Sequence, residues 1–146
     1  MVDGGSAVST ELDLALIADA EGAIVPLAAG LSYSQDDPYA VRLDLHVGLD
    51  EPVTWVFARD LLAAGAEGNY GLGDVRVWPS LASRDEVPAM VLNIRLSSPH
   101  GRAKFEAPLR DVARFLDRSY ELVPRGRESD HVDLDAALAE ILRPAP

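Results

Sequence analysis

Three histidines and two adjacent serines are the first residues to consider for catalysis. His46, His100 and His131 are far apart in the chain, and none has another histidine three or four residues away, the spacing of a helical metal pair. Ser97 and Ser98 precede His100 but lack the Gly-x-Ser-x-Gly pattern of a nucleophile elbow. We therefore predict no catalytic residue, no metal ligand and no enzyme activity.

Two further segments have compositions that occur in ligand sites. Residues 65–73 are rich in glycine, as phosphate loops are, but they contain no lysine and follow an expected helix. A phosphate loop has the opposite order, with a strand before it and a helix after it. Asp36 and Asp37 precede Pro38, which is typical of a turn and lacks the ligand spacing of an EF-hand. We predict a connecting loop, a turn and no bound cofactor.

One candidate partner-binding surface remains, and it consists of Arg76, Trp78, Arg110, Arg114 and Arg118. Alternation in the segment around Trp78 places Val75 and Val77 on one face and the arginine and tryptophan on the other. The other three arginines recur every fourth residue, along one side of a predicted helix. Nearby acids also explain this stripe as a solvated face with local ion pairs. The sequence allows three locations for the Trp78 side chain: beneath the C-terminal helices, at a contact between subunits, or on a partner-binding face.

The elements that position these residues follow from hydrophobic periodicity. Residues 39–47 alternate without interruption, which is typical of a strand with one solvated face. Further strands are expected at residues 10–16, 23–27, 53–58, 73–78, 89–96 and 102–107. Helices are expected at residues 59–64, which Gly65 ends, from Pro108 to Tyr120, and from the N-cap Asp133 to Leu142. This pattern predicts an α+β protein with antiparallel pairing, in which Pro79 ends a strand and residues 81–86 form a loop.

Composition limits the partners and the compartment. The 146 residues carry a net charge of −11 and no cysteine; residues 1–57 account for −9 of that charge. This acidity disfavours nucleic acid, because binding a phosphate backbone depends on lysine and arginine. No apolar run approaches the roughly 18 residues of a membrane span, and the N-terminus does not resemble a signal peptide. We predict a cytosolic protein without membrane insertion, with a flexible head at 1–8 and a single domain at 9–143.

The motifs of the chain resemble those of the SsgA-like proteins of sporulating actinobacteria. The most specific are Trp-Val-Phe-Ala-Arg-Asp-Leu-Leu at 55–62 and Gly-Asp-Val-Arg-Val-Trp-Pro-Ser at 73–80. Other matching segments follow in the same order, at residues 37–41, 96–101, 106–108, 133–135 and 141–142. The resemblance covers roughly residues 8–142, and the SsgB-type branch is the first choice within the family.

The resemblance implies a Whirly-like fold, with two antiparallel β-sheets packed together, C-terminal helices and a homotrimeric assembly. It also implies a non-enzymatic role in sporulation and cell division at the septum. In the SsgB branch this role includes recruitment of FtsZ, a tubulin-like GTPase, so FtsZ and other SsgA-like proteins are the implied partners. Single-stranded nucleic-acid binding, as in Whirly proteins, is the alternative.

Overall fold

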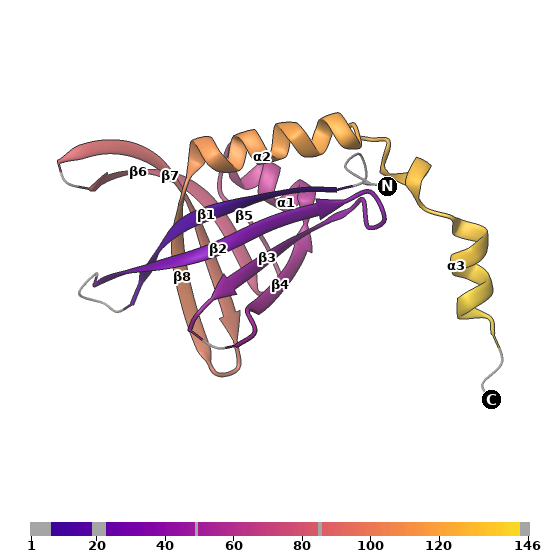
Figure 1. Ribbon diagram of the computed structural model, residues 1–146, viewed down its shortest axis with the longest axis horizontal. Helices are drawn as coiled ribbons and strands as arrows, with labels where there is room; N and C mark the ends of the chain where they lie inside the picture. The colour runs from indigo at the N-terminus through magenta and orange to yellow at the C-terminus, as the bar shows by residue number, and fades with distance from the viewer. Residues whose placement is uncertain (1–6, 19–22, 49, 85, 144–146) are drawn as a thin grey trace.

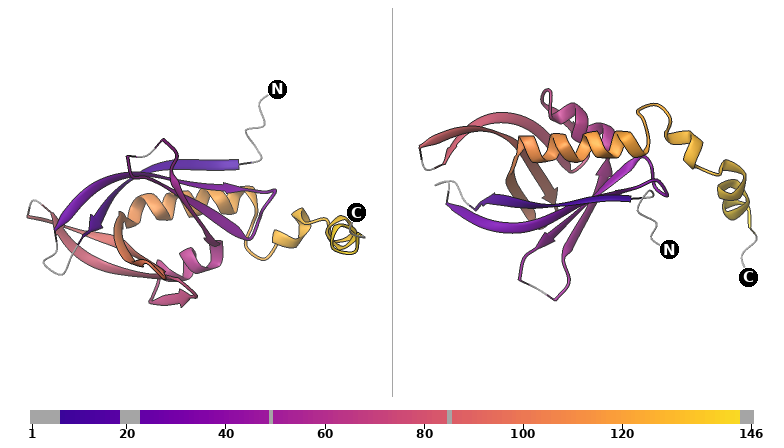
Figure 2. Two further views of the ribbon diagram at one scale, coloured as in Figure 1. Left: turned by 90° about the horizontal axis from the view of Figure 1, so that it is seen from below. Right: turned by 45° about the horizontal axis from the view of Figure 1, so that its top comes forward.

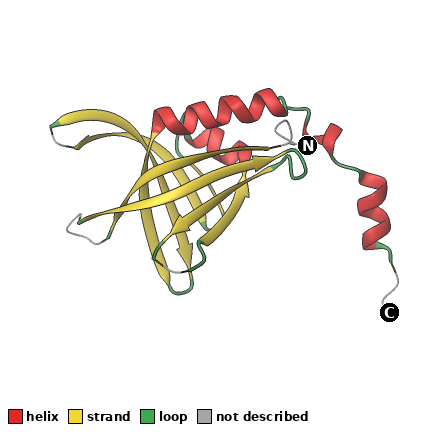
Figure 3. Cartoon of the chain, in the orientation of Figure 1, coloured by secondary structure: helices red, strands yellow, loops and turns green. Residues whose placement is uncertain are grey.

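The structure is a computed structural model that describes residues 7–18, 23–48, 50–84 and 86–143. Within them, eight strands form one antiparallel sheet in the order β4-β3-β2-β1-β8-β7-β6-β5 (Figure 1, Figure 3). The strands are β1 (Ala7–Ile17), β2 (Ile24–Ser34), β3 (Ala40–His46), β4 (Val53–Ala58), β5 (Tyr70–Leu72), β6 (Val75–Arg84), β7 (Val87–Ser98) and β8 (Gly101–Pro108). The helical elements are α1 (Arg59–Gly65), α2 (Leu109–Leu122), the 3₁₀ helix η1 (Glu128–His131) and α3 (Leu134–Ile141).

The α+β class is confirmed, but the expectation of two packed sheets is wrong. The single sheet curls so strongly that two walls face each other across α2 (Figure 2). β1 connects the walls: it pairs with β2 along its whole length, and its last residues, 15–17, pair with β8. The twist of hydrogen-bonded strands accumulates across the sheet, so one continuous sheet is able to enclose a helix. β1 begins at Ala7, within the predicted head, whose residues 1–6 lie outside the described range.

The core lies between the concave face of the sheet and one side of α2. Leu31, Leu43 and Ile94 of the sheet are completely buried, and Val112 and Phe115 of α2 belong to the same apolar cluster. Burying one such side chain contributes about 1.5–3 kcal/mol, so this contact holds α2 in place. On α2 itself Phe115 is buried, whereas Ala113 is exposed on the opposite side.

β6 and β7 extend beyond the body as a two-stranded arm (Figure 1). The prediction that Pro79 ends a strand is wrong, because β6 continues through it to Arg84. The loop predicted at residues 81–86 is wrong at 81–84 for the same reason, whereas Glu86 does lie in the turn before β7. β5 pairs with β6 only as far as Val77, so Pro79 lies where β6 has one neighbouring strand. Proline is tolerated at such an edge because its missing N–H need not break a ladder bond. Met90 of β7 is 45% exposed on this arm.

α1 packs closely against β6 through Gly65. A Cβ atom at Gly65 would lie 2.5 Å from Cβ of Val77 and closer still to its Cγ1. Gly65 was predicted to end the helix, and it is indeed the last helical residue. Its absent side chain also allows the helix to approach the strand, a role that local sequence does not reveal.

The C-terminal segment leaves the body of the protein after α2. Asp133 caps α3 as predicted, because its carboxylate accepts a hydrogen bond from the Ala136 N–H at 2.9 Å. α3 projects away from the sheet (Figure 1, Figure 2), and its side chains Leu138, Ile141 and the adjoining Leu142 are 53%, 76% and 70% exposed. This exposed apolar side is therefore available for contact with another molecule. None of the helices in the described ranges meets the length and hydropathy that crossing a bilayer requires.

Candidate partner-binding surface

Trp78 lies half-buried on the outer, convex face of the sheet. The predicted alternation is confirmed, because Val75 and Val77 are buried on the core side of β6. The guanidinium carbon of Arg95 and the Nζ atom of Lys104 lie 6.0 and 5.8 Å from the centroid of the Trp78 ring. These distances fall within the range of cation–π attraction. Trp78 is therefore not beneath α2, which packs against the opposite face.

Arg76 belongs to a row of three cations that crosses the outer face. In the strand register Arg76 of β6 is directly opposite Arg95 of β7, and Arg95 is directly opposite Lys104 of β8. Directly opposed residues share a face, so the three side chains project to the same side as Trp78. Arg76 Nη1 also donates a hydrogen bond to Asn69 Oδ1 at 2.9 Å. We call Arg76, Arg95, Lys104 and Trp78 the outer cationic row.

The three arginines of α2 lie on a different surface. α2 fills the concave side of the sheet, and Arg110 and Arg114 are exposed on its side away from the core. Arg118 is also exposed, and its Nη1 donates a hydrogen bond to the backbone oxygen of Ser9 in β1 at 3.2 Å. The structure thus brings Arg76 and Trp78 together and separates them from the arginines of α2. The five-residue surface predicted from the sequence is two surfaces.

A buried arginine joins three helical elements, and sequence reasoning missed it. Arg59, the first residue of α1, is 1% exposed. Its Nη1 donates hydrogen bonds to the backbone oxygens of Ser119 and Val123, at 3.1 and 2.8 Å, near the end of α2. Its Nη2 forms an ion pair with Oε2 of Glu128 in η1 at 2.9 Å. Arg59 therefore fixes where the chain leaves α2 and enters the segment that carries α3.

Two tyrosine rings enclose the same guanidinium. The Arg59 guanidinium carbon lies 4.5 Å from the ring centroids of Tyr33 and Tyr120. Burial raises the pKa of Tyr33 to about 12, and its hydroxyl donates to the Pro38 carbonyl at 2.8 Å. We call these residues, with Glu128, the Arg59 cluster. Its geometry is that of a structural clamp, because the charged groups are enclosed and face one another.

The ion pair of Glu128 predicts a measurable pH dependence. Burial acts to raise the pKa of Glu128, but hydrogen bonds from its own backbone and from Arg59, with the positive charge of Arg59, outweigh it and lower the pKa. Because the folded-state pKa is depressed, the stabilisation is present above the unfolded-state value of about 4.3. It is lost as pH falls through the folded-state pKa. We expect E128Q to be less stable than the wild type near neutral pH, with a difference that narrows in acid. Urea unfolding at a series of pH values measures this, and a constant difference would contradict it.

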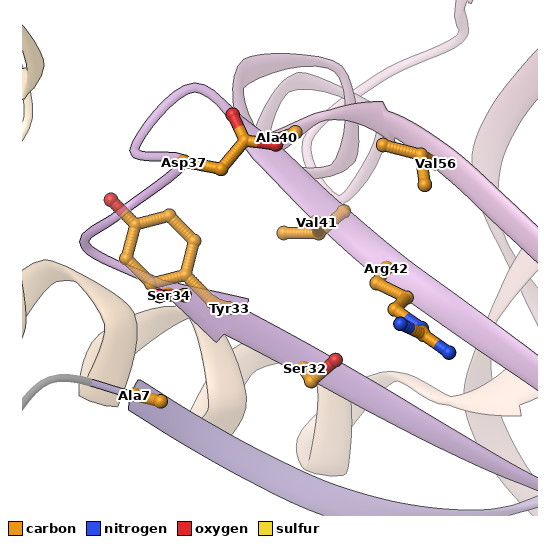
Figure 4. Close-up of a pocket in the computed structure, with 9 residues that line it drawn as sticks. All are labelled: Ala7, Ser32, Tyr33, Ser34, Asp37, Ala40, Val41, Arg42 and Val56. Carbon is orange, nitrogen blue, oxygen red and sulfur yellow. The ribbon is translucent and has the colours of Figure 1, made fainter. Parts of the chain in front are cut away.

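Two open depressions lined by described residues do not assemble a reactive set of side chains. The first is an open depression of about 420 Å³ against β2 and β3, lined by Ser32, Tyr33 and Arg42 among others (Figure 4). Arg42 Nε forms an ion pair with Oδ1 of Asp44 at 3.0 Å. A second depression, of about 300 Å³, lies between β4 and the β7–β8 hairpin and is lined mainly by apolar side chains, including Trp55. Both are open to solvent.

The remaining candidates from the sequence occupy turns and exposed positions. The three histidines are exposed and far apart, with His46 at the end of β3, His100 in the β7–β8 turn and His131 in η1. The described residues contain no group of acids and histidines able to hold a metal. The backbone N–H of His100 donates to Ser98 Oγ at 3.2 Å, so this serine belongs to the hairpin turn. The Asp36 N–H likewise donates to Ser34 Oγ at 3.1 Å in the predicted turn.

The fold defines a class of α+β proteins in which a half-barrel of antiparallel strands encloses one helix. Comparison with known proteins identifies the family within this class. The sequence profile described as "Streptomyces sporulation and cell division protein, SsgA" matches residues 27–128. The chain belongs to this SsgA family of sporulation and cell division proteins, which confirms the resemblance found in the sequence.

Several relatives are similar over nearly the whole chain. The sporulation-specific cell division protein SsgB of Thermobifida fusca is 49% identical, over 97% of this chain and 99% of its own. SsgB of Streptomyces coelicolor is 49% identical, over 92% and 95%. A crystal structure of the SsgA-like sporulation-specific cell division protein from Thermobifida fusca superposes with a TM-score of 0.79 at 50% identity, covering 97% of this chain and all of that one.

Proposed function

We propose that this protein is an SsgB-type, non-enzymatic scaffold that recruits FtsZ to the division septum during sporulation. The observation that carries the proposal is the near full-length similarity to proteins named sporulation-specific cell division protein SsgB. The FtsZ partner and the cytoplasmic position at the septum are expectations of the family resemblance. The outer cationic row supports a role in binding, since it presents aligned charged groups to solvent.

The two arginine-bearing surfaces are separate candidates for contact with division proteins. Arg76 and Trp78 belong to the outer cationic row, and the exposed arginines of α2 are on the other side of the sheet. A partner that uses both must reach around the sheet or contact two copies of the protein. We propose the outer cationic row as the primary contact for FtsZ and the α2 stripe as a second contact, for another SsgA-like protein.

We further propose that the protein works as a homo-oligomer, with a trimer favoured. Leu138, Ile141 and Leu142 at α3 are exposed, and an apolar helix side of this kind suits a contact between subunits. Several copies of a weak site would gain avidity for a polymer whose subunits repeat. Sedimentation equilibrium would determine the number of subunits directly.

We expect the protein to pellet with FtsZ polymers assembled with GTP. W78A is expected to reduce the pelleted fraction severalfold, because it removes the aromatic side chain from the primary contact. H46A, on the exposed end of β3, is the matched surface control. Pelleting of the wild type no greater than that of an unrelated acidic protein would contradict direct recruitment. Equal pelleting of W78A and H46A would move the contact away from Trp78.

Single-stranded nucleic-acid binding, the activity of Whirly-like proteins, is the second candidate. The positive charges of Arg95 and Lys104 on neighbouring strands favour it, since single-stranded nucleic acids follow basic grooves. The overall charge of −11 opposes it. Fluorescence anisotropy with a labelled oligonucleotide at low ionic strength tests this candidate, and absence of binding there would eliminate it.

A further inference from the structure

The outer cationic row is an unusual arrangement in a protein with this charge. Arg76, Arg95 and Lys104 are direct cross-strand neighbours on three consecutive strands. Like charges directly opposite each other destabilise a sheet. Glu106 lies on the same face of β8, two residues from Lys104, so the three cations outnumber the acid beside them, although the whole chain has 24 acidic side chains. A row of this kind is stabilised when an anionic group binds across it.

The dimensions of the row suit a short acidic peptide. Three neighbouring strands span about 10 Å, twice the strand spacing of roughly 4.8 Å. Alternate side chains of an extended peptide are about 7 Å apart, so two acidic residues separated by one residue fall within the row. Trp78, next to Arg76 on the same face of β6, offers an apolar contact for a neighbouring side chain.

The surroundings of the row favour a peptide over a nucleic acid. Trp78 is half-buried, with Arg95 and Lys104 near its ring, so little of the ring is open for base stacking. β1 follows β8 in the sheet and brings the apolar Ile17 directly beside Lys104. A long phosphate backbone extending beyond the row would leave its cations there, whereas a short acidic segment would end before Ile17.

We propose that the outer cationic row binds a short acidic peptide segment of a partner protein, with Arg76, Arg95 and Lys104 pairing its carboxylates and Trp78 contacting an adjacent side chain. This inference rests on the proposed partner-binding role of the same face and specifies the chemistry of what it binds. A polar depression of about 220 Å³ beside Arg76 and Arg95 is also lined by Ser97 and Asp74, so the Ser97 hydroxyl adds a hydrogen-bonding group at one end of the row and the Asp74 carboxylate limits how far an acidic peptide extends there.

The test uses fluorescein-labelled hexaglutamate and the full-length protein at low ionic strength. We expect saturable binding by anisotropy that weakens with added salt, and no binding of labelled hexaglutamine. K104Q and R95Q are each expected to weaken binding about three- to tenfold, the loss of one charge-assisted contact at a partly exposed site. R95K is expected to retain binding, because it keeps the charge. In W55F, where Trp78 is the remaining tryptophan, hexaglutamate is expected to change the tryptophan emission.

The control A113E lowers the net charge by one, as K104Q does, but on the exposed side of α2 away from the row. Equal weakening by A113E and K104Q would overturn the proposal, because binding would then follow net charge. Absence of hexaglutamate binding would also overturn it, as would binding of oligothymidylate in its place. Hexaglutamate binding without FtsZ pelleting would contradict the proposed partner but keep the acidic-peptide site. FtsZ pelleting without hexaglutamate binding would support FtsZ as the partner but contradict the acidic-peptide site.

Discussion

Arg59→Ala is expected to lower the free energy of unfolding by about 3–5 kcal/mol, the range measured when one partner of a buried ion pair is removed. The substitution leaves the Glu128 carboxylate without its cation and removes the donor to two backbone oxygens of the α2 terminus. It also opens a space between the rings of Tyr33 and Tyr120. Urea unfolding followed by circular dichroism measures the change.

An exposed ion pair in the same segment provides the matched control for Arg59. Arg127 Nε and Asp130 Oδ2 are 2.7 Å apart, with side chains 66% and 47% exposed. R127A is expected to change the unfolding free energy by less than about 1 kcal/mol, because surface pairs are screened by solvent. Equal effects of R59A and R127A would show that the Arg59 cluster does not stabilise the fold.

Gly65→Ala is the second large effect, and it is expected to destabilise the protein by about 1–3 kcal/mol through overpacking. The new methyl group would overlap the side chain of Val77, which is fully buried and has little freedom to move. G30A is the matched control, since a Cβ at Gly30 would lie 3.8 Å from the nearest neighbour, the Thr10 carbonyl oxygen. Thermal unfolding measures the loss of stability in G65A and in G30A, and the loss is expected to be larger in G65A.

A double-mutant cycle tests whether overlap with the Val77 side chain causes the destabilisation of G65A. V77G creates a cavity and is destabilising by itself, but in the double variant G65A/V77G the new methyl group no longer overlaps a side chain at position 77. We expect the double variant to be more stable than the sum of the single effects predicts, by about 0.5–3 kcal/mol, the usual range for contacting residues. Strict additivity would show that Gly65 is required for another reason, such as backbone conformation.

Local patterns were sufficient for elements whose neighbours in space are also neighbours in the sequence. The alternation of residues 39–47 correctly predicted β3, and the Asp133 cap correctly placed the start of α3. The outward orientation of Arg76 and Trp78 also followed from the alternation of β6. The extension of β6 past Pro79 was missed because proline was taken to end the strand, whereas its position at an edge makes it compatible with pairing.

Features that depend on distant pairing could not be read from local patterns. Arg59 follows an apolar strand and begins a helix, and its partners Ser119 and Glu128 are at least 60 residues away in the sequence. The sequence predicted only part of the outer cationic row. Arg76 was identified from the alternation of its strand, but placing Arg95 and Lys104 beside it requires the pairing register of three strands. The separation of Arg76 and Trp78 from the arginines of α2 likewise could not be predicted, because it depends on α2 filling the concave face of the sheet.

The joining of the two walls through β1 and β8 has a consequence for biosynthesis. Leu16 pairs with Phe105, a separation of 89 residues. At roughly 5–20 residues per second, a ribosome needs about 4–18 s to make the intervening chain. During that time the end of β1 has unpaired backbone groups that no later strand has reached. The β1–β2 hairpin forms early, whereas closure of the sheet must await the second half of the chain, so this junction should be a late and slow step in folding.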